Sequence, residues 1–263
     1  MSKRDIWASG EAYEPYVGRW SRLVAREFLD WLAVPPASSW LDVGCGTGAL
    51  TEAILQRAHP AAVTGVDPAE GFVAYTREHV QDGRTSFRVG DAMSLPFGDE
   101  AFDAVVSGLV LNFIPRQDVA LAEMARVTSG GGVVAAYVWD YAGEMQLIRA
   151  FWDAAVELDP ATAEKDEGRR FPVCSPEPLA ELFEAAGLAG VDVRAIDVDT
   201  HFRDFEDYWL PFLGGQGPAP GYAMSLPEEG RVALRERIKA KLPVAQDGSI
   251  SLVARAWAVR GSK

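Results

Sequence analysis

The chain has 263 residues, and its 25 Lys and Arg are outnumbered by 38 Asp and Glu, so the formal net charge is −13 at pH 7. Hydrophobic residues make up 48% of the chain and aromatic residues 10%, which is too apolar for a disordered protein and sufficient for a packed core. The acidic balance disfavours proteins that grip nucleic-acid phosphates or an anionic membrane surface, because both need a basic face.

Signals for targeting and for metal binding are also missing from the sequence. The first residues, MSKRDIWASGEAYEPY, contain no apolar core of a signal peptide, and the longest apolar runs, 104–114 and 132–139, are too short to span a bilayer. The two cysteines, Cys45 and Cys174, are far apart and belong to no Cys/His cluster. We therefore expect a cytoplasmic protein without membrane insertion and without a bound metal.

The segment 39–140 alternates short apolar runs with helical patterns. In its last helix we expect Val119, Ala122 and Val127 to face inward, and we expect the glycines 130–132 to end that helix. Strands that alternate with helices predict an α/β fold with a doubly wound, mostly parallel sheet. The predicted strands are 39–43, 62–66, 85–89, 102–108 and 133–138, and the predicted helices are 49–58, 69–80 and 118–128.

Two insertions interrupt this alternation in the second half of the chain, at 141–172 and at about 200–247. The second insertion carries a set of aromatic residues spaced as on one face of a helix. Such a set is typical either of core packing or of a lid over an apolar ligand. In chain order, the expected elements are a helix over 144–158, a charged tip over 164–170, a helix over 177–186, a strand over 190–198, a glycine- and proline-rich loop over 214–222, a basic helix over 228–241 and a last strand over 249–260, antiparallel to 190–198.

The turn after the first strand is rich in glycine. In Leu41-Asp42-Val43-Gly44-Cys45-Gly46-Thr47-Gly48, a strand enters a turn that opens a helix, so backbone N–H groups can approach a ligand closely. The spacing of Gly44, Gly46 and Ala49 also matches the dinucleotide-binding fingerprint with alanine in its third place. The turn alone therefore does not separate a nicotinamide cofactor from other nucleotide-like ligands.

Three acidic residues lie near the ends of successive strands. Asp67, 19 residues after Gly48, is placed to bind both hydroxyls of a ribose, or else to start the next helix. Asp91 either accepts a hydrogen bond from an adenine amino group or is an ordinary turn residue. Asp42 lies inside an apolar strand, where a carboxylate needs hydrogen bonds, so it either ties down N–H groups of the loop or binds a ligand ammonium.

Longer motifs carry a resemblance to a known family. LDVGCGTGALT, GVDPAEG, VGDAMSLPFGDEAFDAVVS and GGGVVAAYVWD resemble the successive motifs of class I S-adenosylmethionine-dependent methyltransferases, in the small-molecule group that includes the ubiquinone/menaquinone-biosynthesis type. YEPYVGRWSR resembles the N-terminal arm that covers the cofactor in that group. Thr128-Ser129-Gly130 departs from the Lys-Pro-Gly that is common there, and the second insertion matches no substrate signature.

The resemblance implies S-adenosylmethionine as cofactor and S-adenosylhomocysteine as product. Glycines of the turn would cradle the amino-acid and ribose portion of the cofactor. Asp67 would bind the ribose diol. Asp91 would bind the adenine amino group, and the Ala92 N–H would reach the adenine ring. Met93 or Leu95 would pack on the adenine, unless both belong to ordinary core or loop packing. The predicted cofactor-binding residues are Tyr16, Arg19, Asp42, Gly44, Gly46, Gly48, Asp67, Pro68, Asp91, Ala92, Met93 and Asn112.

The N-terminal arm, the end of the fifth strand and the second insertion supply the candidate residues around the reacting groups. Arg19 would pair with the cofactor carboxylate, and an aromatic such as Tyr16 would shield the sulfonium, although a helix packing its aromatics on the sheet gives the same pattern. The predicted acceptor-binding residues are Tyr13, Trp139, Phe205 and Trp209.

Methyl transfer needs alignment first, and a base only if the acceptor must lose a proton. The candidate catalytic residues are Asp140, at the end of the fifth strand, Asn112, after the fourth, and His201, at the start of the second insertion. Each has a structural alternative: Asp140 as a helix cap, Asn112 as the cap of the turn before Pro115, and His201 as a surface histidine.

The family resemblance implies a Rossmann-like sheet of seven strands with an antiparallel last strand and helical lid insertions. The expected organisation is an N-terminal arm over 1–38, a cofactor-binding core over 39–140, a helical insertion over 141–175, a core helix and strand over 176–199, a lid over 200–248 and the last strand over 249–263.

Three functions are compatible with the residues. The first is methyl transfer to a small, apolar or aromatic acceptor. The second is a nicotinamide-dependent oxidoreductase, which the Gly/Ala spacing and Asp67 allow. The third is a noncatalytic cofactor-binding module, because no residue is an unmistakable base. The expected partner is a small molecule and not a nucleic acid, and the sequence gives no prediction of oligomeric state or of the acceptor atom.

Overall fold

The computed structural model describes residues 14–215 and 217–263. The chain divides into two compact units. We call the first the sheet unit; it comprises Ser21–Trp139, Val173–Ile196 and Ala256–Lys263. We call the second the helical unit; its described residues are those up to Trp20, Asp140–Pro172 and Asp197–Arg255. The predicted arm, 1–38, is thus divided between the two units after Trp20.

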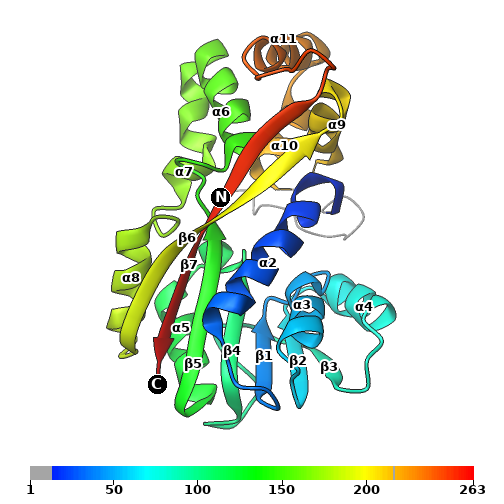
Figure 1. The fold of residues 1–263 in the computed structure, drawn as a ribbon. Helices are drawn as coiled ribbons and strands as arrows, with labels where there is room; N and C mark the ends of the chain where they lie inside the picture. Colours follow the sequence, from blue (N-terminus) through cyan, green and yellow to red (C-terminus); the bar gives the residue numbers. More distant parts are fainter. Residues whose placement is uncertain (1–13, 216) are drawn as a thin grey trace. The chain divides into compact units, whose positions relative to one another are not determined.

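The sheet has seven strands in the order β3-β2-β1-β4-β5-β7-β6, which confirms the predicted fold class (Figure 1). Strands β1 to β5 pair in parallel, and β7 is antiparallel to β5. The central strands β1 and β4 are mostly buried, since both faces of a parallel sheet are covered, and Asp42 and Asp103 interrupt their apolar pattern. The strands are β1 (Ser39–Val43), β2 (Ala62–Asp67), β3 (Thr85–Val89), β4 (Phe102–Gly108), β5 (Thr128–Trp139), β6 (Ala189–Phe202) and β7 (Ile250–Ser262).

The position of β7 was only partly predicted. It neighbours β6, as expected, but its other edge pairs with β5, where Tyr137 lies opposite Ala258. The sequence missed this second pairing because the pairing joins residues more than a hundred positions apart, and no local pattern reports it. β6 also continues to Phe202, beyond the predicted 190–198, so His201 belongs to a strand.

Helices cover both faces of the sheet: α2 lies in front of it in Figure 1 and α5 behind it. α3 and α4 pack against β2, α4 also packs against β3, and α5 packs against β4 and β5 and beside α8. On α2, Phe28 packs against Tyr137 of β5, with ring centroids 4.8 Å apart. The helices are α2 (Arg19–Leu32), α3 (Ala49–Arg57), α4 (Glu70–His79), α5 (Gln117–Val127) and α8 (Pro176–Ala185).

Two local predictions around α5 were wrong. The helix buries Leu121 and Met124 together with Val127, and Ala122, which we expected inside, is exposed. The larger side chains decide which stripe faces the sheet, because they bury more apolar area than alanine. The glycines 130–132 do not end the helix, which stops at Val127; they lie within β5. A Cβ on Gly132 would lie 2.7 Å from the Asp103 carbonyl oxygen, so this approach of β4 and β5 requires glycine.

The helical unit is built on an aromatic core. Tyr16 meets Phe212 edge to face at 5.3 Å, Phe212 stacks on Phe151 at 4.7 Å, and Tyr208 lies 5.5 Å from Phe212. The aromatic side chains of the second insertion, Phe202, Phe205, Tyr208, Trp209 and Phe212, are thus buried in this unit, and a lid over the acceptor stays a prediction. The elements are η1 (Glu14–Gly18), α6 (Gln146–Leu158), η3 (Pro160–Lys165), α7 (Glu167–Arg170), α9 (Phe205–Trp209), η4 (Leu210–Gly214), α10 (Pro218–Ser225) and α11 (Glu228–Lys239).

Two more predictions in this unit were wrong. The expected loop over 214–222 contains the start of α10, because Pro218 occupies the first helical turn, where a missing N–H costs nothing. The expected charged tip over 164–170 is partly interior: Asp166 and Glu167 are only 6% and 1% exposed. The run of charged residues predicted an exposed segment, but Arg149 of α6 pairs with Asp166 and allows it to be buried.

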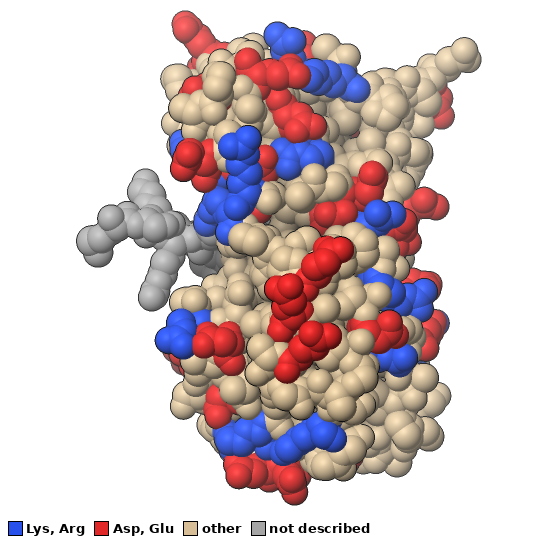
Figure 2. Space-filling view, turned by 90° about the vertical axis from the view of Figure 1, so that its left-hand side faces the viewer, with Lys and Arg blue, Asp and Glu red and all other residues tan. Residues whose placement is uncertain are grey.

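Basic and acidic side chains are interspersed on the face shown in Figure 2.

Within residues 14–215 and 217–263, no helix combines the length and the apolar character that crossing a bilayer would require.

Candidate functional site

The glycine turn between β1 and α3 has three residues with positive φ: Gly44 at 76°, Gly46 at 52° and Gly48 at 88°. L-residues with a side chain resist this conformation. The backbone N–H groups of Gly44 and Cys45 both donate to the Val66 carbonyl oxygen of β2, at 2.7 and 3.0 Å. The turn is therefore fastened to the neighbouring strand and not a free loop.

The three glycines differ in what surrounds them. A Cβ on Gly44 would lie 2.6 Å from Val110, and one on Gly48 would lie 2.8 Å from both Thr76 and Val80. A Cβ on Gly46 would meet nothing closer than the Gly44 carbonyl oxygen, at 3.9 Å. Packing inside the protein thus explains Gly44 and Gly48, and the open side of the turn, where a ligand could approach the backbone, is at Gly46.

Asp42, on β1 directly before the turn, is 1% exposed. The Thr51 hydroxyl on α3 donates to its Oδ2 at 2.7 Å, and Oδ1 has no hydrogen-bond partner within the part of the chain that the structure describes. Burial raises the pKa of Asp42 to about 7; the Thr51 hydroxyl opposes this shift and Asp67 adds to it. The sequence had not singled out Thr51. The free oxygen is suited to a cationic group of a ligand.

Asp67 is the last residue of β2 and is 7% exposed. Its carboxylate accepts hydrogen bonds from the backbone N–H groups of Gly46, at 3.1 Å, and Ala69, at 2.8 Å. Burial raises the pKa of this carboxyl, and the bonds from Ala69 and Gly46 oppose the rise. Asp67 therefore joins the glycine turn to the start of α4, as expected if its role is to start that helix. A carboxylate oxygen accepts more than one hydrogen bond, so a ribose diol remains a compatible partner.

Asp91 follows β3 in a tight turn and is exposed. It accepts a hydrogen bond from the Met93 N–H at 2.9 Å, which is the behaviour of a turn aspartate. Leu95 is 4% exposed and belongs to the core, whereas Ala92 and Met93 are half-buried. Of the two side chains predicted to pack on an adenine, Met93 is therefore the accessible one.

Asn112 lies on η2 (Leu111–Phe113), the short helix after β4, and is 4% exposed. Neither polar atom of its side chain has a hydrogen-bond partner among residues 14–215 and 217–263. It therefore does not cap the turn before Pro115. A buried polar group without a partner costs about 1–3 kcal/mol. Leu109, three residues earlier, has a φ of 62°, and such backbone strain in a non-glycine residue is concentrated at functional sites.

The strands that carry or precede these residues, β1 to β4, end at one edge of the sheet (Figure 1). Asp42, Asp67 and Asp91 lie at or just beyond the carboxyl ends of β1, β2 and β3, and Asn112 follows β4. Open α/β sheets bind ligands along this edge. The unpartnered oxygen of Asp42 and the open backbone at Gly46 fit the ammonium and the adjoining portion of S-adenosylmethionine. Pro68, between Asp67 and α4, completes the predicted set on this edge.

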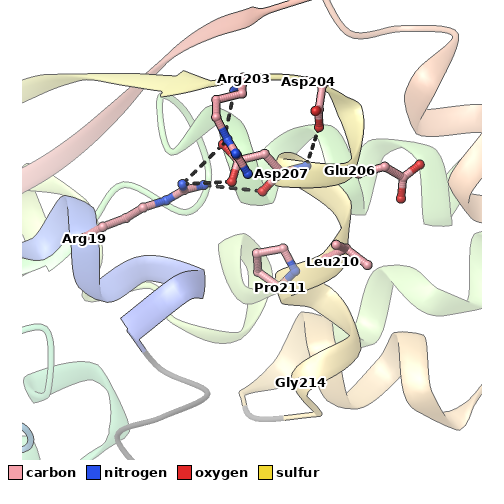
Figure 3. A pocket seen from close by; sticks show the side chains of 8 residues that line it. All are labelled: Arg19, Arg203, Asp204, Glu206, Asp207, Leu210, Pro211 and Gly214. Atoms are coloured by element: carbon pink, nitrogen blue, oxygen red, sulfur yellow. Dashed lines mark hydrogen bonds and ion pairs between the residues drawn. The ribbon is translucent and has the colours of Figure 1, made fainter.

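In the helical unit, Arg19 lies beside a pocket of about 440 Å³ (Figure 3). Its guanidinium donates to the Asp207 carboxylate at 3.2 Å and lies 4.4 Å from the ring of Trp20 and 4.8 Å from that of Phe202. The Arg19 charge thus has a carboxylate partner already, and pairing with a cofactor carboxylate stays a prediction. The pocket is lined by Arg19, Arg203, Asp204, Glu206, Asp207, Leu210, Pro211 and Gly214.

The predicted acceptor-binding aromatics are mostly interior. Phe205 and Trp209, on α9, are 7% and 3% exposed, and the Phe205 ring is flanked by Arg235 at 5.0 Å. Trp139, at the end of β5, is 2% exposed in the sheet unit. Tyr13 lies outside the described residues. The acceptor role of these four residues remains a prediction.

The predicted bases have structural partners. Asp140 is 7% exposed and accepts hydrogen bonds from the backbone N–H groups of Gly143, at 3.0 Å, and Glu144, at 2.9 Å. This matches the capping alternative, with Asp140 ordering the turn before α6. His201 is exposed on β6, with its Nδ1 3.4 Å from the Ser251 hydroxyl. A catalytic role for either side chain is still a prediction.

Comparisons with known proteins agree with the sequence motifs. A family model described as a methyltransferase domain matches residues 41–136. A demethylmenaquinone methyltransferase of Roseiflexus sp. (strain RS-1) is 32% identical over 181 residues, which is 63% of this chain and 74% of that protein. A ubiquinone/menaquinone biosynthesis C-methyltransferase UbiE of Paracoccus denitrificans is 36% identical over 115 residues, 42% of this chain and 46% of that protein. The chain therefore spans about half the length of the second relative.

The fold has counterparts among solved structures. Phosphoethanolamine N-methyltransferase 2 of Haemonchus contortus, in complex with S-adenosyl-L-methionine, superposes with a TM-score of 0.60 at 17% identity. The match covers 96% of this chain and 56% of that one. At this identity the similarity concerns the fold, which is the seven-stranded arrangement described above.

Proposed function

Because the chain belongs to the class I S-adenosylmethionine-dependent methyltransferases, in the group related to quinone-biosynthesis enzymes, we propose that its acceptor is the ring of an aromatic diol of the hydroquinone type. The observation that carries this proposal is the similarity to the Roseiflexus demethylmenaquinone methyltransferase along 74% of that protein. The shared region extends well beyond the matched methyltransferase domain, so it includes more than the parts that any methyltransferase needs for its cofactor.

The family membership decides among the functions that the residues allowed. The protein is an enzyme that uses S-adenosylmethionine, and the nicotinamide-dependent and noncatalytic alternatives are set aside. Bound S-adenosylmethionine supplies a methyl group on a sulfonium, which a nucleophile attacks in line. The task of this chain is then to hold the cofactor and to orient the acceptor, and orientation alone can remove several kcal/mol of the barrier.

We assign the cofactor to the edge of the sheet unit. The free Oδ1 of Asp42 supports binding of the ammonium, and Asp67 supports binding of the ribose hydroxyls. The adenine would lie by Asp91, Ala92 and the accessible Met93. Asn112, with two unpartnered polar atoms, is the residue that we assign next to the reacting groups.

An aromatic diol suits the two candidate bases that the structure describes, Asp140 and His201, since attack by a ring carbon does not require a strong base. A ring hydroxyl donates electron density to the neighbouring ring carbon, and that carbon forms the bond to the methyl group as the bond from methyl to sulfur breaks. The ring carbon then loses its proton to water, aromaticity returns, and the cofactor would leave as S-adenosylhomocysteine. Both oxygens of Asp140 already accept backbone N–H groups, and His201 is exposed, so neither supports a mechanism that depends on a buried base.

The acceptor class is tested with a panel under reducing conditions. The purified protein is incubated with S-adenosylmethionine and, separately, with 1,4-naphthohydroquinone, a simple phenol, an aliphatic amine and a thiol. Mass spectrometry identifies the products, and S-adenosylhomocysteine is quantified. We expect methylation at a ring carbon of the naphthohydroquinone. Turnover of the amine or the thiol alone would reject the aromatic-diol assignment.

A further inference from the structure

Thr51, in the first turn of α3, is fully buried and uses its hydroxyl outside its own helix. A buried threonine in a helix often bonds the carbonyl oxygen four residues earlier, as the Thr128 hydroxyl does with Met124 at the end of α5. The Thr51 hydroxyl instead donates to Asp42 Oδ2, on β1, at 2.7 Å. The bond therefore joins the two elements on either side of the glycine turn.

This hydrogen bond fixes the direction of both carboxylate oxygens of Asp42. A carboxylate is planar, so holding Oδ2 against α3 also sets where Oδ1 points. Oδ1 is buried, and from residue 14 onward, apart from residue 216, no group forms a hydrogen bond with it. It is the oxygen to which we assigned the ammonium of the cofactor. Without the Thr51 hydroxyl, the carboxylate would be free to turn about its last side-chain bond.

Thr51 also stabilises the charged form of Asp42. Burial raises the pKa of Asp42 to about 7, and the Thr51 hydroxyl and, more weakly, its backbone N–H oppose this rise. Two titratable groups face the carboxyl: Asp67 of β2 adds to the rise, and burial raises the pKa of the Cys45 thiol, so that the thiol stays neutral. The residues paired with Asp42 on the two neighbouring strands are a glycine of β2 and a valine of β4, which carry no charge.

We propose that Thr51 is a positioning residue for the cofactor, because its hydroxyl holds the Asp42 carboxylate in the orientation that binds the ammonium of S-adenosylmethionine. The inference rests on the proposed function, in which the ammonium is assigned to Asp42, and it adds a residue that touches no ligand. The alternative is that the bond only fastens α3 to β1. The two roles are separable, since fastening does not depend on whether a ligand carries an ammonium.

Thr76, on α4, provides a matched control. It is also fully buried, and its hydroxyl donates to the Gly46 carbonyl oxygen at 2.5 Å. The Gly46 N–H in turn donates to Asp67, the residue assigned to the ribose. Thr76→Val therefore removes a hydroxyl from the same turn, at equal burial, and leaves the bond to Asp42 in place. Its effect should be the same for every ligand that contains the nucleoside.

The test measures the binding of two ligands to the full chain by titration calorimetry at neutral pH. S-adenosylhomocysteine carries the ammonium, and methylthioadenosine lacks the whole amino-acid portion. Thr51→Val should raise the Kd for S-adenosylhomocysteine by about tenfold, because the carboxyl is less ionised and no longer held. The Kd for methylthioadenosine should stay within about twofold, which also shows that the variant is folded.

Two further variants complete the comparison. Thr51→Ser keeps the hydroxyl and should restore the wild-type affinity for S-adenosylhomocysteine. Thr76→Val should change the two Kd values by the same factor, because it does not alter the partner of the ammonium.

The pH profile gives a second readout. Asp42 attracts an ammonium only when it is ionised, so the pH below which binding of S-adenosylhomocysteine weakens is about 7 in the wild type. Loss of the Thr51 hydroxyl should move this pH up by about one unit. The difference between Thr51→Val and the wild type should therefore shrink as the pH rises, and Thr76→Val should keep the wild-type profile.

The outcomes separate the inference from the assignments beneath it. A wild-type affinity and pH profile in Thr51→Val, or an equal loss for both ligands, would overturn the positioning role and leave the cofactor assignment in place. Wild-type affinity for S-adenosylhomocysteine in Asp42→Asn would overturn the assignment of the ammonium, and the inference with it. These titrations contain no acceptor, so a failure of the aromatic-diol proposal would appear separately, in the acceptor panel.

Discussion

The hydroxyl of Thr51 donates a 2.7 Å hydrogen bond to one carboxylate oxygen of Asp42, and no residue in the described part of the chain bonds the other oxygen. The Asp42 carboxyl group is thus buried in the sheet unit, with Oδ2 hydrogen-bonded to α3 and Oδ1 without a hydrogen bond from the described residues. Such an arrangement is unfavourable without a ligand, since a buried acceptor is left unpaired. We expect it to become favourable when the ammonium of the cofactor binds beside the glycine turn.

Binding of S-adenosylmethionine should therefore depend on pH through Asp42. Burial raises the pKa of Asp42 to about 7, and only the ionised form attracts an ammonium. Below pH 7 the affinity should fall by up to about tenfold per pH unit, because the proton must leave before the ion pair forms. Titration calorimetry at several pH values measures this. Asp42→Asn should bind weakly and without this dependence, and a flat wild-type profile would contradict the assignment.

Asn112 should affect turnover more than cofactor binding. Asn112→Ala removes two unpartnered polar atoms from the interior, so the free energy of unfolding should stay the same or rise. If the side chain orients the reacting groups, kcat should fall by about 10- to 100-fold. Calorimetry with S-adenosylhomocysteine serves as the control and should show a nearly unchanged Kd. A variant with wild-type kcat would remove Asn112 from the reaction.

Alanine substitutions at Gly44 and Gly46 should have different effects on stability and on cofactor binding. Gly44→Ala places a Cβ 2.6 Å from Val110 and should lower the free energy of unfolding strongly. Gly46→Ala meets no such contact, so its stability loss should be limited to about 1–2 kcal/mol for the positive φ. Its main effect should be weaker binding of S-adenosylmethionine, because the open side of the turn is filled.

Chemical denaturation and calorimetry on both variants measure this contrast. Gly83→Ala, at an open position with no close neighbour, is the matched control. Equal stability losses in the Gly44 and Gly46 variants, with equal cofactor affinities, would show that the two glycines have the same role.

Stability should depend on pH through Glu167. Its pKa is about 8 in the folded protein and near 4.5 in an unfolded chain, so the folded state holds the proton more tightly. The contribution of Glu167 to stability is therefore complete below about pH 4.5 and is lost as the pH rises towards 8, at up to about 1.4 kcal/mol per pH unit.

Glu167→Gln lacks this titration. The difference in unfolding free energy between Glu167→Gln and the wild type should therefore grow in favour of the variant from about pH 5 to about pH 8. The raised pKa of Asp42 is common to both proteins and cancels. Denaturation curves across this range measure the difference, and parallel profiles would mean that Glu167 is not a buried acid.

The sheet was predictable because its signals are local. Short runs with β-branched or aromatic residues, bounded by Gly, Asp or Pro, predicted β1 to β4 within a residue or so. The glycine turn marked the edge of the sheet at which Asp42, Asp67 and Asp91 lie. The order of the motifs then predicted S-adenosylmethionine as the cofactor, and the similarity to known methyltransferases confirmed this prediction.

The missed features depend on contacts between distant parts of the chain. Arg19 pairs with Asp207, 188 residues away, and no pattern near either residue reports it. Glu167 lies in a run of charged residues that resembles a solvated tip, and only the pairing of Asp166 with Arg149 explains why its neighbour is interior. Thr51 was missed for a similar reason, since its bond to Asp42 depends on how α3 packs on β1.

The most direct test of the account follows the methyl group itself. The protein is incubated with S-adenosylmethionine carrying a deuterated methyl group and with 1,4-naphthohydroquinone, and the product is analysed by mass spectrometry and NMR. The account predicts one equivalent of S-adenosylhomocysteine for each ring-methylated product, with all three deuterons retained. Binding of S-adenosylmethionine without transfer to a ring carbon of the diol would contradict it.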